Sequence, residues 1–104
     1  MLLAEIDGDA VGLLVAQRTL ASFQAVDSCN IHDVYVTENA RGRGIARSLM
    51  TLAEDHASAL GCARMTLEVN AGNTAGLALY RSLGYDVPEG DLPTRATLFV
   101  RKSL

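Results

Sequence analysis

Short apolar stretches alternate with polar or glycine-containing breaks along the whole chain, and most of these stretches fit β-strands. Near the N-terminus two apolar runs flank Asp7-Gly8-Asp9, a sequence typical of a hairpin turn. Later apolar runs bounded by turn residues have the length of single strands. The pattern predicts strands over 1–6, 10–19, 31–36, 63–70, 85–87 and 96–102, and loops over 21–29 and 88–94.

Two segments instead repeat apolar residues at spacings of three and four, which predicts helices. The longer helix covers 45–60 and stops before Gly61, because glycine commonly follows a helix end. The shorter helix begins with Asn73 or Thr74 as its N-cap and runs to Leu83. The longer helix is expected to bury one stripe, formed by Ile45, Leu49, Leu52, Ala53, His56, Ala57 and Leu60.

The composition fits one small domain over residues 1–104, since 49% hydrophobic and 20% charged residues are ordinary for a chain with its own core. A net charge of −3 argues against nucleic acid as a partner, and the apolar runs are too short to span a membrane. The first residues are acidic rather than basic and do not resemble a signal peptide. Cys29 and Cys62 lack metal-ligand spacing. We therefore expect reduced thiols, no bound metal and a cytoplasmic location.

The most informative stretch joins the third predicted strand to the longer helix through a turn rich in glycine and arginine. Peptide N–H groups at a helix start have no partner within the helix, and the helix dipole favours negative charge there. Gly42 and Gly44 leave these amides accessible. Arg41, Arg43 and Arg47 place a third of the nine basic residues around the same point. The turn is therefore predicted to bind phosphate or pyrophosphate.

Two common phosphate-binding loops do not fit this turn. A nucleoside-triphosphate loop requires Gly-Lys-Ser/Thr after its glycines, which is missing. A dinucleotide-binding fingerprint requires a third glycine at the position of Arg47. Taken alone, the turn is either a different anion site or an ordinary glycine-rich connection from strand to helix.

Two motifs lie on either side of the longer helix. Arg41-Gly42-Arg43-Gly44-Ile45-Ala46 stands at its start, and the segment from Leu67 to Tyr85 follows it with Leu-Glu-Val-Asn-Ala, Leu-Tyr and Gly-Tyr. In this order they resemble the GNAT superfamily of N-acetyltransferases. The family's acetyl-CoA signature reads Gln/Arg-x-x-Gly-x-Gly/Ala, and its second block runs strand, Asn, Ala, Leu-Tyr, Gly-aromatic. The resemblance is good over residues 31–104. Over residues 1–28 it consists only of the two predicted strands.

The resemblance implies an α/β (α+β) fold, with a mixed, mostly antiparallel sheet flanked by helices. In the family the third strand splays from the next, and the pantetheine arm of acetyl-CoA pairs with its backbone in the V-shaped gap. A backbone N–H near Val34 could also serve the oxyanion. Asn73 is implied to bond the pantetheine arm, and it equally suits an N-cap. The implied cofactor-binding residues are Val34, Tyr35, Val36, Arg41, Gly42, Arg43, Gly44, Ile45, Ala46, Asn73 and Tyr80.

Tyr80 is the implied general acid. In the family, a tyrosine at this place in the Leu-Tyr-x-x-Leu-Gly pattern points at the sulfur of CoA. A phenol suits protonation of a thiolate, because its pKa lies near or somewhat above that of a thiol. The alternative is a core aromatic, since Leu77 and Leu83 lie at helical spacing from it.

Glu68 is the implied base, because a similar Leu-Glu-Val pattern occurs in enzymes that acetylate the N-terminal residue of a ribosomal protein. A plain exposed or ion-paired glutamate is an equal alternative. His32, Asp33 or a water chain could also take the proton. Adjacent strand residues point to opposite faces, so only one of His32 and Asp33 is expected to face the cleft.

These features predict an acetyl-CoA-dependent N-acetyltransferase that moves an acetyl group to a primary amine of a small molecule or protein by direct attack on the thioester. Typical family members carry a further strand and one or two helices before the hairpin. We therefore expect an N-terminally truncated form with a less complete acceptor pocket and a strand edge that a second copy covers in a homodimer. The alternatives are a non-catalytic acyl-CoA-binding remnant and one half of a two-chain enzyme.

Overall fold

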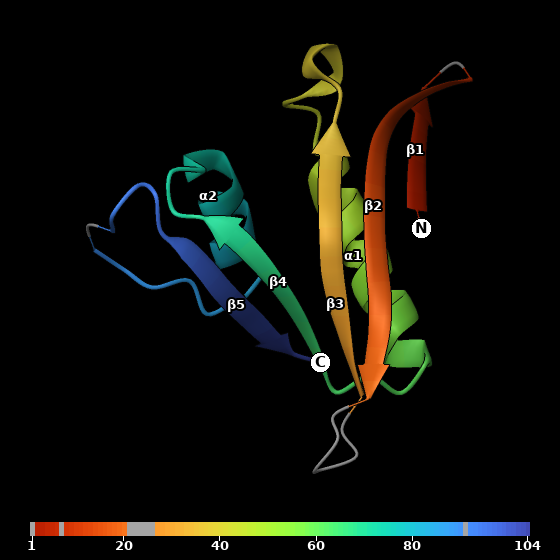
Figure 1. Cartoon of the computed structure of the whole chain (residues 1–104). Coiled ribbons are helices and arrows are strands. Elements are labelled where there is room, and N and C mark those ends of the chain that lie inside the picture. The colour runs from red at the N-terminus through yellow and green to blue at the C-terminus, as the bar shows by residue number, and fades with distance from the viewer. Residues whose placement is uncertain (1, 7, 21–26, 91) are drawn as a thin grey trace.

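The protein is seen in a computed structural model that describes residues 2–6, 8–20, 27–90 and 92–104. The described residues form a five-stranded sheet in the order β1-β2-β3-β4-β5 (Figure 1). The elements are β1 (Leu2–Ile6), β2 (Asp9–Leu20), β3 (Asp27–Val36), the 3₁₀ turn η1 (Glu38–Ala40), α1 (Ile45–Ala59), β4 (Arg64–Asn70), α2 (Thr74–Ser82) and β5 (Thr97–Ser103). Neighbouring strands are antiparallel except for β3 and β4, which are parallel, so the predicted mixed sheet is confirmed.

Helix α1 packs across β1, β2 and β3 and lies behind them in Figure 1. Gly12 in β2 permits the close approach, because a Cβ there would lie 3.0 Å from Ile45 Cγ2 and 3.2 Å from Leu49 Cδ1. This contact fixes the first turn of α1, and with it the glycine- and arginine-rich turn before it. The centre of the core is formed by Leu14, Met50, Met65, Leu67 and Val100, each less than 2% exposed.

Strand β3 is longer than the sequence indicated. We expected it to begin at Ile31 after a loop over 21–29, but it begins at Asp27. Asp27 pairs with β2, and its carboxylate accepts hydrogen bonds from Arg18, so cross-strand contacts hold a polar segment in the sheet. Residues 21–26, where the rest of that loop was expected, lie outside the described residues.

The buried stripe of α1 is rotated relative to the expected one. Three residues that we placed on it are exposed: Leu52, His56 and Leu60. The buried residues of the helix are Leu49, Met50, Ala53 and Ala57. Within the described residues β1 pairs with β2 no further than Leu14, whereas β2 continues to Leu20. The last turns of α1 therefore extend past the end of β1, and none of the described residues buries Leu52, His56 or Leu60 on their outer flank.

The predicted strand over 85–87 does not form. The segment bonds to a single residue of β5: the Asp86 N–H donates to Arg101 O (3.0 Å), and Asp86 Oδ1 accepts from the Arg101 N–H (2.6 Å). One of these two bonds is made by the Asp86 side chain. The segment 85–87 therefore lies at the edge of β5 but does not continue the backbone hydrogen-bond ladder of the sheet. Apart from the early start of β3, the other predicted strands and both helices begin and end within one residue of the prediction. In the described part of the chain, no helix has the length and apolar character needed to cross a bilayer.

Candidate active site

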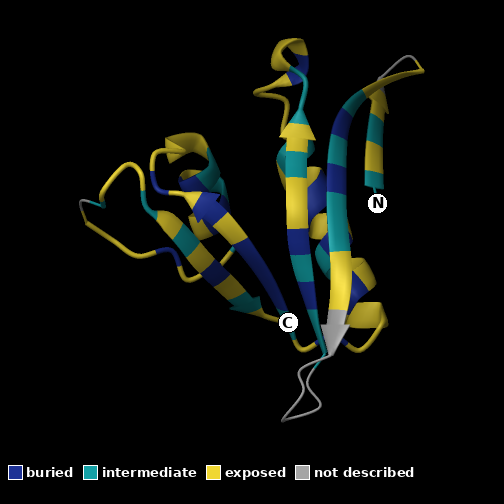
Figure 2. Cartoon of the chain, in the orientation of Figure 1, coloured by how far each residue is buried: buried dark blue, intermediate teal, exposed yellow. Residues whose placement is uncertain are grey.

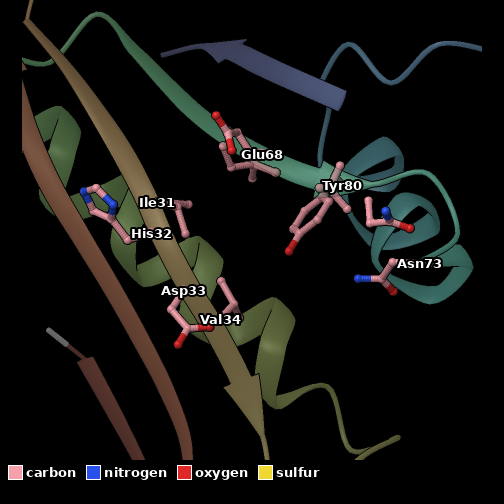
Figure 3. Close-up of a pocket in the computed structure, with 10 residues that line it drawn as sticks. Ile31, His32, Asp33, Val34, Glu68, Asn73 and Tyr80 are labelled. Carbon is pink, nitrogen blue, oxygen red and sulfur yellow. The ribbon is translucent and has the colours of Figure 1, made fainter. Parts of the chain in front are cut away.

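The parallel pairing of β3 and β4 ends early and leaves a gap between the two strands. The last paired residues are Ile31 and Leu67, and beyond them the strands diverge (Figure 1). Ile31 is buried, and Figure 2 shows that β3 is mostly exposed toward its end. The gap contains a hollow of about 190 Å³ between β3, β4 and α2 (Figure 3). It is lined by Ile31, His32, Asp33, Val34, Leu67, Glu68, Val69, Asn70, Asn73 and Tyr80.

The backbone of β3 is oriented so that a ligand could pair with it from the gap. The Thr37 N–H donates to Val11 O in β2 (2.8 Å). Successive residues of a strand direct their peptide groups to opposite sides, so those of Val36 and Val34 face away from β2. In agreement, the Val36 carbonyl accepts from Arg41 Nε (3.1 Å). The N–H and C=O of Val34 therefore lie on the side where an extended ligand could add as a strand.

The gap continues into a groove between the start of α1 and α2. A hollow of about 400 Å³ shares Val34 and Tyr80 with the gap, and it shares Arg41 and Leu79 with another of about 310 Å³ at the turn before α1. We call these two hollows the α1–α2 groove; its lining is Val34, Tyr35, Val36, Ala40, Arg41, Gly42, Gly44, Ile45, Ala46, Arg47, Asn73, Ala75, Gly76, Leu79 and Tyr80. Every residue predicted to bind acetyl-CoA except Arg43 lines this groove.

The amides of α1 are open at the turn end of the groove. Gly42 and Gly44 have φ angles of 81° and 77°, in the left-handed region that glycine adopts most easily. A Cβ on either residue would meet no protein atom within 4 Å. Gly44 is the N-cap, without a side-chain cap, and its carbonyl accepts the N–H of Ser48 (3.0 Å). The N–H groups of residues 45–47 have no partner from the helix itself, which suits an anion.

Two of the three arginines around the turn belong to the groove. The Arg41 guanidinium lies 5.8 Å from the centroid of the Tyr35 ring, within cation–π range. Arg47 lines the groove from the first turn of α1, and its Nη2 donates to Ser82 Oγ at the end of α2 (2.6 Å). Both positive charges therefore flank the open amides.

Arg43 lies apart from the other two. It lines a separate hollow of about 320 Å³ together with Asp9 and residues of β2 and η1. The structure thus does not bring all three guanidinium groups of the turn to one point.

Tyr80 projects from α2 into the gap, and Figure 3 shows its hydroxyl directed toward β3. The residue is 9% exposed, and its ring meets that of Tyr85 edge to face with centroids 5.9 Å apart. Burial raises the pKa of the Tyr80 hydroxyl, and the nearby Asp33 carboxylate raises it further. The phenol is therefore protonated at neutral pH and can act as a proton donor.

The three candidate bases all line the gap, Glu68 from β4 and the pair His32 and Asp33 from β3. We expected only one of the pair to face the cleft, and Figure 3 shows the ring of His32 directed away from Tyr80, on the far side of β3. The register between β2 and β3 shifts here: Ile31 and Asp33 pair with adjacent residues of β2, so His32 is an extra residue. Such a bulge breaks the alternation of faces, and both side chains are exposed.

Asn73 is the N-cap of α2, as predicted, because its Oδ1 accepts the N–H of Gly76 (2.9 Å). Gly76 was not among the predicted site residues. A Cβ there would lie 2.5 Å from Asn73 Nδ2, so this glycine lets the amide of Asn73 fold over the first turn of the helix. The sequence does hold a signal for it: a glycine three residues after a capping asparagine stands where the cap's hydrogen bond is donated.

Comparison with known proteins relates this geometry to one enzyme family. A family model described as "Acetyltransferase (GNAT) family" matches residues 1–85. An L-methionine sulfoximine/L-methionine sulfone acetyltransferase of Pseudomonas aeruginosa is 33% identical over 70 residues, which make up 67% of this chain and 40% of that protein. The chain spans between 38% and 60% of the length of the first curated relatives it matches.

Solved structures resemble the fold over nearly the whole chain. A ribosomal-protein-alanine N-acetyltransferase from Brucella melitensis has a TM-score of 0.78 and 30% identity, covering 98% of this chain and 67% of its own. Naa50 of Arabidopsis thaliana, in complex with the bisubstrate analogue CoA-Ac-MVNAL, has a TM-score of 0.81 and 21% identity, covering 98% of this chain and 71% of its own. This second likeness concerns the fold alone.

Proposed function

The chain belongs to the acetyltransferase (GNAT) family, and from this membership and the site we propose that it transfers an acetyl group from acetyl-CoA to a primary amine of a small molecule or protein. The observation that carries the proposal is the position of Tyr80. Its hydroxyl lies in the gap between β3 and β4, and that gap opens into the α1–α2 groove. A proton donor and an anion-binding turn therefore stand at the two ends of one continuous depression.

The groove fits acetyl-CoA in its chemistry. The open amides of residues 45–47 and the guanidinium of Arg47 suit the pyrophosphate. The peptide groups of Val34 suit the amides of the pantetheine arm, and Asn73 lies beside the same part of the groove. Acetyl-CoA supplies the thioester, and the protein's task is to hold both reactants and handle their protons.

The residues of the gap divide the proton transfers between them. The amine nitrogen forms a bond to the thioester carbon and loses a proton to Glu68 or to a water beside it. The Val34 N–H can donate to the carbonyl oxygen as negative charge develops there. Tyr80 gives its proton to the departing sulfur as the C–S bond breaks, and its raised pKa keeps that proton available.

A turnover assay with acetyl-CoA tests this proposal across a panel of small amines and peptides. Release of free thiol should depend on the acceptor and exceed the rate without one. Binding of acetyl-CoA without turnover on any amine would favour a non-catalytic acyl-CoA-binding protein instead.

We expect Glu68→Gln to act mainly on the acidic side of the pH–rate profile. A carboxylate base stops working when it is protonated, so the wild-type rate should fall as the pH is lowered. Glutamine cannot titrate, so the variant should be slower and should lose this acidic limb. The measurement is kcat/KM against pH for both proteins. An unchanged profile would assign the base to His32, Asp33 or water.

We also propose that the protein forms a homodimer through β1. This strand is at one edge of the sheet, no described residue pairs with its outer side, and Leu3 is 51% exposed. The opposite edge differs, because Asp86 bonds both the N–H and the C=O of Arg101 in β5. A second copy could therefore add to β1 as a further strand.

Light scattering after size-exclusion chromatography should show a dimer at micromolar concentration. Leu3→Lys should shift it toward monomer, because the charge would be buried at the contact. Phe99→Lys is the matched control, since Phe99 is 56% exposed on the other edge strand and its variant should remain dimeric. A monomer at high concentration would contradict the proposal.

A cytoplasmic location is a further proposal. It is supported by Cys29 and Cys62, which are buried and not joined in a disulfide. Fractionation of cells that produce the tagged chain would test it.

A further inference from the structure

One polar contact joins the two walls of the α1–α2 groove. Arg47 in the first turn of α1 donates through Nη2 to Ser82 Oγ (2.6 Å), and Ser82 Oγ donates in turn to Leu79 O (2.7 Å). The hydroxyl is thus held between a cation and a carbonyl at the end of α2. Among the described residues no other hydrogen bond links α1 directly to α2.

This link stands at a weak place in the architecture. Strands β3 and β4 pair at four positions. Beyond these positions, the segment of the chain that contains α2 contacts α1 through side chains. Farther along α1, Glu54 accepts from Lys102 Nζ (2.5 Å) and from the Tyr85 hydroxyl (3.1 Å). Arg47 and Ser82 form the corresponding bridge at the groove. Among the described residues, these two bridges are the side-chain hydrogen bonds that join α1 to the part of the fold beyond β4.

The same arginine is also placed to meet a phosphate. Arg47 lines the groove together with Gly42 and Gly44, where the amides of α1 are open. Arg41 already donates to a carbonyl of β3, and Arg43 lines another hollow. A guanidinium carries five N–H donors in a planar fork, so Arg47 can hold the Ser82 hydroxyl and a phosphate oxygen at the same time.

We propose that Arg47 is a positioning residue, which binds the pyrophosphate of acetyl-CoA and Ser82 together and thereby fixes α2, with Tyr80, beside the thioester. The inference rests on the function proposed above. Tyr80 and Ser82 belong to the same nine-residue helix, so a shift of Ser82 moves Tyr80. A helix this short gains its order from its contacts rather than from its own propensity.

Hydrogen exchange and kinetics on the whole chain test this coupling. Acetyl-CoA should slow amide exchange over residues 78–82 of the wild type by about fivefold or more. Ser82→Ala should lose this protection and lower kcat roughly tenfold, while the Kd for acetyl-CoA changes less than about twofold. Arg47→Met should lower both affinity and kcat, and adding Ser82→Ala to it should cost no further kcat, because the link is already gone.

Two control variants separate the coupling between Arg47 and Ser82 from the general effect of losing a hydroxyl or a positive charge. Ser103→Ala removes an exposed hydroxyl at the end of β5 and should keep wild-type kcat and protection. Arg43→Met removes a positive charge from the turn just before α1, but it should leave the protection of α2 by acetyl-CoA intact.

The outcomes distinguish this inference from the proposed function. Wild-type kcat and protection in Ser82→Ala would overturn the inference and leave the acetyltransferase proposal standing. Binding of acetyl-CoA without turnover would defeat the enzyme proposal, while the exchange measurement would still decide the coupling. If acetyl-CoA does not bind, both fail.

Discussion

Replacing Tyr80 with phenylalanine is expected to lower kcat by about 100-fold or more, the usual scale for a positioned general acid. The variant keeps the ring, so its burial and its edge-to-face contact with Tyr85 should be preserved. It loses only the hydroxyl that faces the gap. Because the groove for acetyl-CoA is otherwise unchanged, the Kd measured by calorimetry should change little.

Tyr85→Phe is the matched control for this experiment. The Tyr85 hydroxyl donates to Glu54 Oε2 (3.1 Å) rather than facing the gap. Its loss should lower the free energy of unfolding by about 1 kcal/mol and leave kcat near the wild-type value. Both variants are best compared between about pH 7 and 9, where the phenol of Tyr80 is protonated because its pKa is raised above its usual value near 10. A near-wild-type rate for Tyr80→Phe would show that this residue only packs.

Much of the fold follows from signals within single segments. The Asp7-Gly8-Asp9 sequence, the glycines after each helix and the cap at Asn73 are local signals, and the elements beside them have nearly the predicted ends. The turn before α1 is equally local, since open amides follow directly from glycines at a helix start. The turn could therefore be predicted from its own residues, whereas the other residues that line the groove were implied by the family resemblance.

The features that were missed depend on pairing between distant segments. The bulge at His32 arises from the register between β2 and β3. The sequence of β3 alone does not indicate this register. The early start of β3 at Asp27 and the rotated stripe of α1 follow from how far the neighbouring strands extend. In the sequence, Arg43 and Arg47 are equally good candidates for the anion site. In the structure, they line different hollows. Side-chain direction at such positions is set by tertiary packing.

Gly44→Glu is expected to abolish binding of acetyl-CoA, with a loss of affinity of at least about 100-fold, or roughly 2.7 kcal/mol. The side chain would start from the N-cap of α1, where a Cβ meets no protein atom within 4 Å. The glutamate side chain would therefore extend into the space where we propose that the pyrophosphate binds. There it brings both bulk and a negative charge against the anion, and it competes for the open amides.

The substitution also has a cost that is independent of any ligand. Gly44 has a φ of 77°, so a residue with a Cβ is strained there by roughly 1–2 kcal/mol. Gly90→Glu is the matched control: its φ is 93°, a Cβ would again meet no protein atom, and it lies outside the α1–α2 groove. It adds the same charge and a similar strain, so both variants should lose comparable stability in denaturant unfolding. Only Gly44→Glu should lose the calorimetric signal of acetyl-CoA. Equal affinity in Gly44→Glu and wild type would mean that the turn before α1 is a structural connection, and the pyrophosphate would then have to bind elsewhere.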